Sequence, residues 1–143
     1  HKVAGAPASM GMSLEEVEYV ARDVANRIGT MGVALDAVTI PGADTINDRL
    51  SDSNTIEIGL GIHGEAGIRQ SPLLTSDELA KTMIDQILSH GICLDNDNKD
   101  NTIIQPTFHK GDELAIMVNN LGGTSNFEMS ILTNSIVTLL ESP

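Results

Sequence analysis

The stretch Thr55–Gly67, TIEIGLGIHGEAG, runs from an apolar strand pattern into four glycines that surround a single histidine, His63. The β-branched and apolar residues of Thr55–Ile62 predict a strand. The glycines leave little side-chain bulk, so that backbone and ligand can approach closely. The sequence therefore predicts a strand and loop that present His63 as the best candidate for chemistry.

Three helices are predicted around this stretch. Each begins with a capping box, in which a Ser or Thr is followed three residues later by Glu. Behind each cap, apolar residues recur at intervals of three and four. Gly29 is expected to end the first helix and Gly91 the second. The three caps are Ser13–Glu16, Thr75–Glu78 and Ser125–Glu128.

Further strands are predicted at Val33–Ile40 and Glu113–Asn119, with a shorter one at Thr102–Gln105. The segments Asp44–Asn54 and Gly67–Thr75 are rich in turn-forming residues and are expected to be irregular. Helices and strands thus alternate without internal repeats. This order predicts a single α/β domain over residues 1–143, with one sheet covered by helices.

The charge of the chain argues against polyanionic partners. Eight Lys and Arg stand against 20 Asp and Glu, which gives a formal net charge of −12 at pH 7. Such a field repels nucleic acid and anionic membrane surfaces. No apolar run approaches the roughly 20 residues that span a bilayer, and the lone Cys93 fits a reducing compartment. We expect a soluble, cytoplasmic protein.

Two other types of site, a dinucleotide site and a zinc site, match parts of the motif, but the surrounding sequence lacks what each of them needs. The stretch Gly59–Gly64 matches the dinucleotide fingerprint GxGxxG, but no helix is expected until about Thr75 to hold a pyrophosphate. The HGE triplet has the spacing of a zinc deaminase motif, yet the paired cysteines are missing. His90 is expected at a helix end and His109 in a surface turn. We therefore predict no metal site, and we read residues 95–101, DNDNKDN, as a solvated turn rather than a calcium loop.

A neutral imidazole at cytoplasmic pH exposes a lone pair that can attack a carbonyl carbon. His63 is thus a candidate nucleophile or general acid–base, with Glu65 placed to orient the ring or bind a substrate hydroxyl. The alternative is a turn histidine packed under a loop. The loop Asn119–Ser125 is either an anion cradle or a structural turn, and the turn is favoured because the loop lacks the lysine of a phosphate-binding loop.

Three stretches together carry a resemblance that covers almost the whole chain: the central motif, VNNLGGTSNFE at Val118–Glu128, and the opening HKVAGAPA. They resemble the second half of the K subunit of dihydroxyacetone kinases. The resemblance implies a two-layer mixed sheet covered by helices. It also implies that His63 forms a covalent hemiaminal with dihydroxyacetone, in a substrate site that includes Gly61, Gly64 and Glu65. Ala66 departs from the family, where proline is usual.

The same resemblance implies what this chain lacks. The first subdomain, with the acid–base aspartate of the family, is absent, and the final strands of the sheet are expected to be missing. No cofactor is bound by this chain. ADP or ATP with Mg²⁺ is carried by a nucleotide-binding L subunit or fused domain, and the full-length protein is expected to be a homodimer. We expect the isolated fragment to be inactive as a phosphotransferase. The alternative function is a non-enzymatic dihydroxyacetone sensor or coactivator.

The glycines of the motif are expected to matter for the site more than for the fold. A valine at Gly61 or Gly64 would be strained if the backbone there has positive φ, and it would fill space that a substrate needs.

Overall fold

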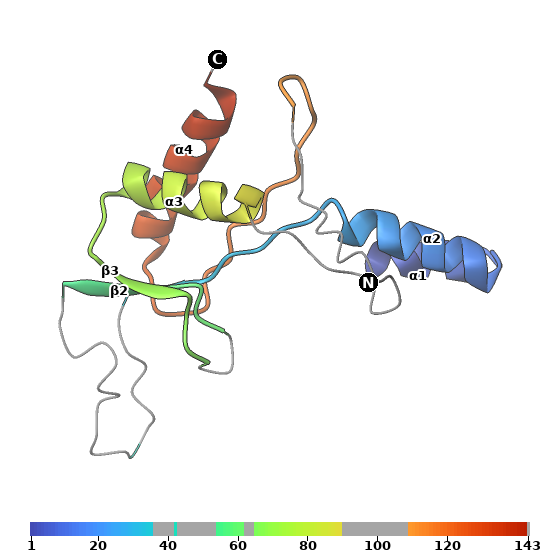
Figure 1. The fold of residues 1–143 in the computed structure, drawn as a ribbon, viewed down its shortest axis with the longest axis horizontal. Coiled ribbons are helices and arrows are strands. Elements are labelled where there is room, and N and C mark those ends of the chain that lie inside the picture. Colours follow the sequence, from blue (N-terminus) through green and yellow to red (C-terminus); the bar gives the residue numbers. More distant parts are fainter. Residues whose placement is uncertain (36–41, 43–53, 62–64, 90–108, 143) are drawn as a thin grey trace. The chain divides into compact units, whose positions relative to one another are not determined.

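A computed structural model describes residues 1–35, 42, 54–61, 65–89 and 109–142, and Figure 1 draws the chain as a ribbon. The elements are α1 (Lys2–Ser9), α2 (Leu14–Ala25), β1 (Val33–Ala34), β2 (Thr55–Ile58), β3 (Arg69–Pro72), α3 (Ser76–Ser89) and α4 (Asn126–Glu141). The chain divides into two compact units, His1–Thr30 with Gln86–Glu113, and Met31–Asp85 with Leu114–Pro143.

In the first unit, helices α1 and α2 pack against each other (Figure 1). The sequence did not predict α1, because Gly5 and Pro7 both disfavour a helix interior. The helix nevertheless forms, with Gly5 N donating to His1 O at 2.9 Å. Packing against α2 outweighs the poor local propensity. Helix α2 ends at Ala25 with Asn26 as its C-cap, a few residues before the predicted end at Gly29.

All three predicted capping boxes are confirmed by hydrogen bonds between the capping side chain and the glutamate. Each bond stabilises the charged carboxylate, which lowers the pKa of the glutamate. The backbone N–H of the cap residue is the main cause for Glu16 and Glu78, and the Ser125 hydroxyl is the main cause for Glu128.

The sheet of the second unit contains β1, β2 and β3 in that order, and both pairs are antiparallel. Within the described residues there is no parallel pair, so the predicted mixed sheet is not observed there. Strand β2 ends at Ile58 rather than at Ile62, because Gly59 turns the chain with φ of +81°. The described part of the predicted strand Val33–Ile40 forms a ladder only over Val33–Ala34.

Strand β3, with the sequence RQSP, lies in a segment that was expected to be irregular, so that prediction was wrong. Its residues are polar and show no apolar alternation. The strand exists because its backbone pairs with β2, with Ile58 opposite Arg69 and Thr55 opposite Pro72. Pro72 is tolerated at the strand end, on the outer strand of the described sheet.

Ile56 and Ile58 form the centre of the core, each only 1% exposed. They pack with Leu79 of α3, and helices α3 and α4 cover this side of the sheet (Figure 1). A core without aromatic residues follows from the aliphatic composition. The surrounding partly buried side chains are Met31, Val33, Leu74, Met83 and Leu132.

The predicted strand Glu113–Asn119 forms no ladder with any described strand, so that prediction is wrong for this structure. Most of its apolar side chains are exposed, Met117 to 87%, whereas Val118 is half-buried. The β-branched pattern was present, but a strand also needs a neighbouring strand to bond. The predicted strand Thr102–Gln105, the turn 95–101 and almost all of the loop Asp44–Asn54 lie outside the described residues. Among the described helices, none has the length and apolar character to cross a membrane.

Candidate functional site

The central motif leaves the sheet at the end of β2. Gly59 N donates to Gly32 O at 2.7 Å, which ties the start of the loop to the segment before β1. A Cβ atom at Gly59 would lie 2.7 Å from Cγ1 of Ile68, and its positive φ disfavours any side chain there. Glycine is therefore required at this exit from the strand.

Hydrogen bonds between described residues close the loop that follows. Ile68 N donates to Ile58 O at 2.8 Å at its base, and Gly61 N donates to Glu65 O at 3.4 Å nearer its tip. Between them, Gly67 N donates to the side chain of Glu57 at 2.6 Å. The two ends of the segment that carries His63 are thus held together.

His63 and Gly64 lie outside the described residues, so their predicted roles stay predictions. Their described neighbours Gly61 and Glu65 do lie together. A Cβ atom at Gly61 would collide with Oε2 of Glu65 and would lie 2.9 Å from its Cδ. The carboxylate of Glu65 therefore lies against the bare backbone of Gly61.

A side chain at Gly61 would have to displace the Glu65 carboxylate, which is a different constraint from the one predicted. Gly61 is not among the glycines with positive φ. The constraint is instead the space that Glu65 occupies, so the expectation of backbone strain at Gly61 was wrong. For Gly64 the same expectation lies outside the described residues.

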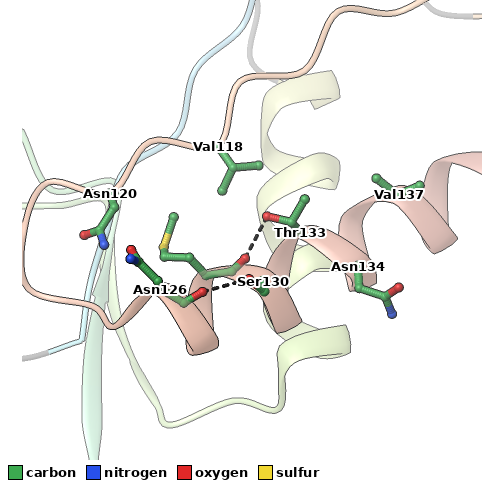
Figure 2. Close-up of a pocket in the computed structure, with 8 residues that line it drawn as sticks. Val118, Asn120, Asn126, Ser130, Thr133, Asn134 and Val137 are labelled. Carbon is green, nitrogen blue, oxygen red and sulfur yellow. Dashed lines mark hydrogen bonds between the residues drawn. The ribbon is translucent and has the colours of Figure 1, made fainter.

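A separate open groove of about 650 Å³ lies along one face of α4. Figure 2 shows Ser130, Thr133, Asn134 and Val137 on the helix, with Val118 and Asn120 across from them. None of the lining side chains is ionisable, and neither Gly61 nor Glu65 lines the groove. The groove thus offers amide and hydroxyl contacts but no acid–base group of its own.

The loop Asn119–Ser125 forms the turn that was favoured for it. The Asn120 side chain accepts from Gly122 N at 2.8 Å and donates to Thr124 O at 2.5 Å. Gly122 has φ of +112° and supplies the left-handed residue of the turn. Asn120 thus satisfies backbone groups just before the cap of α4.

Among the described residues, no three His, Cys, Asp or Glu side chains come close enough to hold a metal ion. His63, His90 and Cys93 lie outside that part of the chain. His109 is in an exposed turn, as predicted, with Asp112 N donating to its carbonyl at 3.0 Å.

Sequence analysis missed Glu57, which is only 5% exposed although it is acidic and lies in the middle strand. A signal for it was present in the motif, because an acidic residue between two isoleucines directly before a glycine run interrupts an otherwise apolar strand.

The model of one protein family, described as the Dak1 domain, matches residues 1–143. The chain belongs to the Dak1 family. This Dak1 chain is 39% identical over 141 residues to the triokinase/FMN cyclase of Homo sapiens, which covers 99% of the chain and 22% of that protein. It is 32% identical over 142 residues to the dihydroxyacetone-binding subunit of a PTS-dependent dihydroxyacetone kinase of Listeria innocua, with 99% and 38% covered.

Solved structures share the fold of the Dak1 chain. The dihydroxyacetone kinase of C. freundii, in complex with AMP-PNP and Mg²⁺, matches with a TM-score of 0.71 and 30% identity, over 100% of this chain and 23% of that one. A dihydroxyacetone kinase operon co-activator matches with a TM-score of 0.66 and 23% identity, over 99% and 39%, and this likeness shows the fold alone. The Dak1 chain spans about a fifth of the length of the first curated relatives that it matches.

Proposed function

We propose that this Dak1 chain is the substrate-binding part of a dihydroxyacetone kinase, and that His63 holds dihydroxyacetone as a covalent hemiaminal. The observation that carries the proposal is the closed glycine loop, in which bonds at Ile58–Ile68 and Gly61–Glu65 fix both ends of the segment with His63. The names of the relatives supply the substrate class.

The hemiaminal step needs no external reagent. The lone pair of one imidazole nitrogen forms a bond to the carbonyl carbon, and the carbonyl π pair moves to the oxygen. That oxygen takes up a proton, while the other ring nitrogen gives one up, so charge and atoms balance. Glycerol has no electrophilic carbon and forms no such bond. The covalent step therefore selects a short ketone over a polyol.

Gly61, Gly64 and Glu65 complete the proposed site. The Glu65 carboxylate is an acceptor for a substrate hydroxyl, because it already lies against Gly61 at the edge of the segment with His63. Gly61 leaves the space that the Glu65 carboxylate occupies, and Gly64 is expected to leave room for the substrate. Glu65 thus supplies a contact, and His63 supplies the bond.

Phosphoryl transfer is assigned to a partner. The chain contains no phosphate-binding lysine motif. It covers only 23% of the C. freundii kinase chain, whose structure is a complex with AMP-PNP and Mg²⁺. We propose that the nucleotide and its metal ion are carried by a separate L subunit or a fused domain, and that the substrate-binding protein is a homodimer. This chain alone is then expected not to phosphorylate dihydroxyacetone from ATP.

The test uses [2-¹³C]dihydroxyacetone and this chain within the longest natural polypeptide that carries it. Formation of the hemiaminal converts the labelled ketone carbon to one with four single bonds, which ¹³C NMR separates clearly. His63→Ala is expected to abolish the new signal. His109→Ala is the matched control, since that imidazole is exposed in a turn.

The pH dependence gives a second readout. Protonated imidazole has no free lone pair, so the adduct should weaken as the pH falls below the imidazole pKa, ordinarily about 6.5. An adduct that survives in His63→Ala would overturn the proposal. An adduct without phosphoryl transfer, even with every nucleotide-bearing partner present, would favour the sensor or coactivator function.

A further inference from the structure

We propose that Glu57 is a positioning residue for the site, which clips the loop carrying His63 to the middle strand of the sheet. The inference rests on the proposed function of His63, but the clip itself is a feature of the described residues. It joins the side chain of Glu57 to the backbone of Gly67, four residues after His63.

Glu57 is held in the middle strand of the sheet, which is paired on both sides. It lies in β2, with Ala34 of β1 opposite on one side and Gln70 of β3 opposite on the other. Its neighbours Ile56 and Ile58 point to the helix-covered core, so alternation places Glu57 on the other face. There it is still only 5% exposed.

The contact itself is short and specific. Gly67 N donates to Oε1 of Glu57 at 2.6 Å. Hydrogen bonds to a carboxylate are shorter and about twice as strong as neutral ones. Burying a carboxylate is costly unless it is bonded, and an apolar residue would be cheaper at this position. The hydrogen bond from Gly67 N therefore explains why an acidic residue is buried at position 57.

Gly67 shows how closely the loop passes over the strand. A Cβ atom at this position would lie 2.5 Å from Ile58 O and 2.8 Å from Cγ of Glu57. Since one of these neighbours is backbone of the sheet, the clash has no easy relief. A glycine at position 67 and an acid at position 57 thus form one matched contact.

The hydrogen bond between Glu57 and Gly67 fixes a third point of the loop, in addition to the two backbone hydrogen bonds that close it. Ile58–Ile68 is an ordinary closure of the hairpin, and Gly61–Glu65 is long at 3.4 Å. Covalent attack requires the reacting atoms to be held in a narrow geometry, and small displacements cost much of the rate or affinity. Glu57 acts through the loop and need not contact the substrate.

The test compares Glu57→Gln and Glu57→Leu in the same polypeptide as above. Glutamine keeps an oxygen that accepts from Gly67 N, whereas leucine keeps the bulk but not the acceptor. Ile56→Val is the matched control, because it perturbs the same strand on its core face. Two quantities are measured, amide hydrogen exchange along residues 59–68 and the affinity for [2-¹³C]dihydroxyacetone as its adduct.

In Glu57→Leu we expect the amide at position 67 to lose its protection and the adduct to weaken by about tenfold, as for loss of a hydrogen bond to a charged group. Glu57→Gln should restore most of both, and Ile56→Val should change neither, even if it lowers the melting temperature. If Glu57→Leu does not fold, Glu57→Ala removes the acceptor without adding bulk and should give the same local loss.

An unchanged adduct and an unchanged amide at position 67 in Glu57→Leu would overturn the inference. So would a loss of adduct in Ile56→Val as large as that in Glu57→Leu, because the effect would then reflect general destabilisation. If the wild-type protein forms no adduct, the proposed function fails, while the exchange data still decide whether Glu57 holds the loop.

Discussion

Ser135→Ala tests how α4 is joined to α3. Ser135 is only 7% exposed, and its hydroxyl donates to Oδ1 of Asp77 at 2.6 Å. A hydroxyl has one proton, so the 2.8 Å contact with the Ser76 hydroxyl must have Ser76 as donor. The substitution removes both bonds. A neutral bond contributes about 0.5–1.5 kcal/mol and one to a charged group about 1.5–3 kcal/mol.

Because Asp77 is itself exposed, water replaces part of what is lost, and the lower ends of the two ranges apply. We expect the free energy of unfolding to fall by about 2 kcal/mol. Urea denaturation followed by circular dichroism measures it as a lower midpoint with an unchanged slope. Ser130→Ala is the control, since that exposed hydroxyl donates to Asn126 O within its own helix.

A double-mutant cycle with Ser76→Ala isolates the bond between the two serines. The coupling energy should be about 0.5–1.5 kcal/mol. A coupling near zero, or a midpoint for Ser135→Ala no lower than for Ser130→Ala, would refute the reasoning.

Three further outcomes are expected. Gly61→Ala should displace the Glu65 carboxylate and weaken the dihydroxyacetone adduct while leaving the far-ultraviolet circular dichroism unchanged. An adduct of unchanged strength would show that the contact between Gly61 and Glu65 does not contribute to substrate binding. The capping glutamates have a lower pKa in the folded state, so their stabilisation is complete above their unfolded-state pKa of about 4.3 and is lost as the pH falls through the folded value. Replacing all three with Gln should therefore flatten the acid side of a plot of unfolding free energy against pH. An unchanged plot would mean that other groups cause the loss of stability in acid. Ile58→Ala should cost about 2–5 kcal/mol of unfolding free energy and Met117→Ser less than about 0.5 kcal/mol, with equal losses contradicting the assigned core.

Helices were predictable from the sequence where a cap and an apolar face agreed. Ser13, Thr75 and Ser125 each start a helix within one residue of the expected place, because the capping box is a local interaction. Helix α1 was not predictable in this way. Its Gly5 and Pro7 disfavour a helix, and among the described residues α2 is the element that packs against it.

Strands were less predictable because their stability is not local. The polar β3 pairs with β2 although its sequence shows no strand pattern, and Glu113–Asn119 has the pattern but no partner strand among the described residues. At the site, the glycine motif indicated the loop correctly. It could not reveal that Glu57 reaches across to Gly67, because that contact depends on the hairpin register.

The exposed run Leu114–Met117, which pairs with no strand among the described residues, makes the colloidal behaviour of the chain depend on acidity. An unpaired apolar backbone segment is a template for sheets between molecules. At pH 7 the formal charge of −12 keeps copies apart, but near the isoelectric point of about 4.4 that repulsion vanishes. Because the pKa of the capping glutamates is lowered, the helix caps persist while this repulsion is lost. Precipitation of this chain in mild acid is therefore expected to begin at Leu114–Met117 rather than in its core.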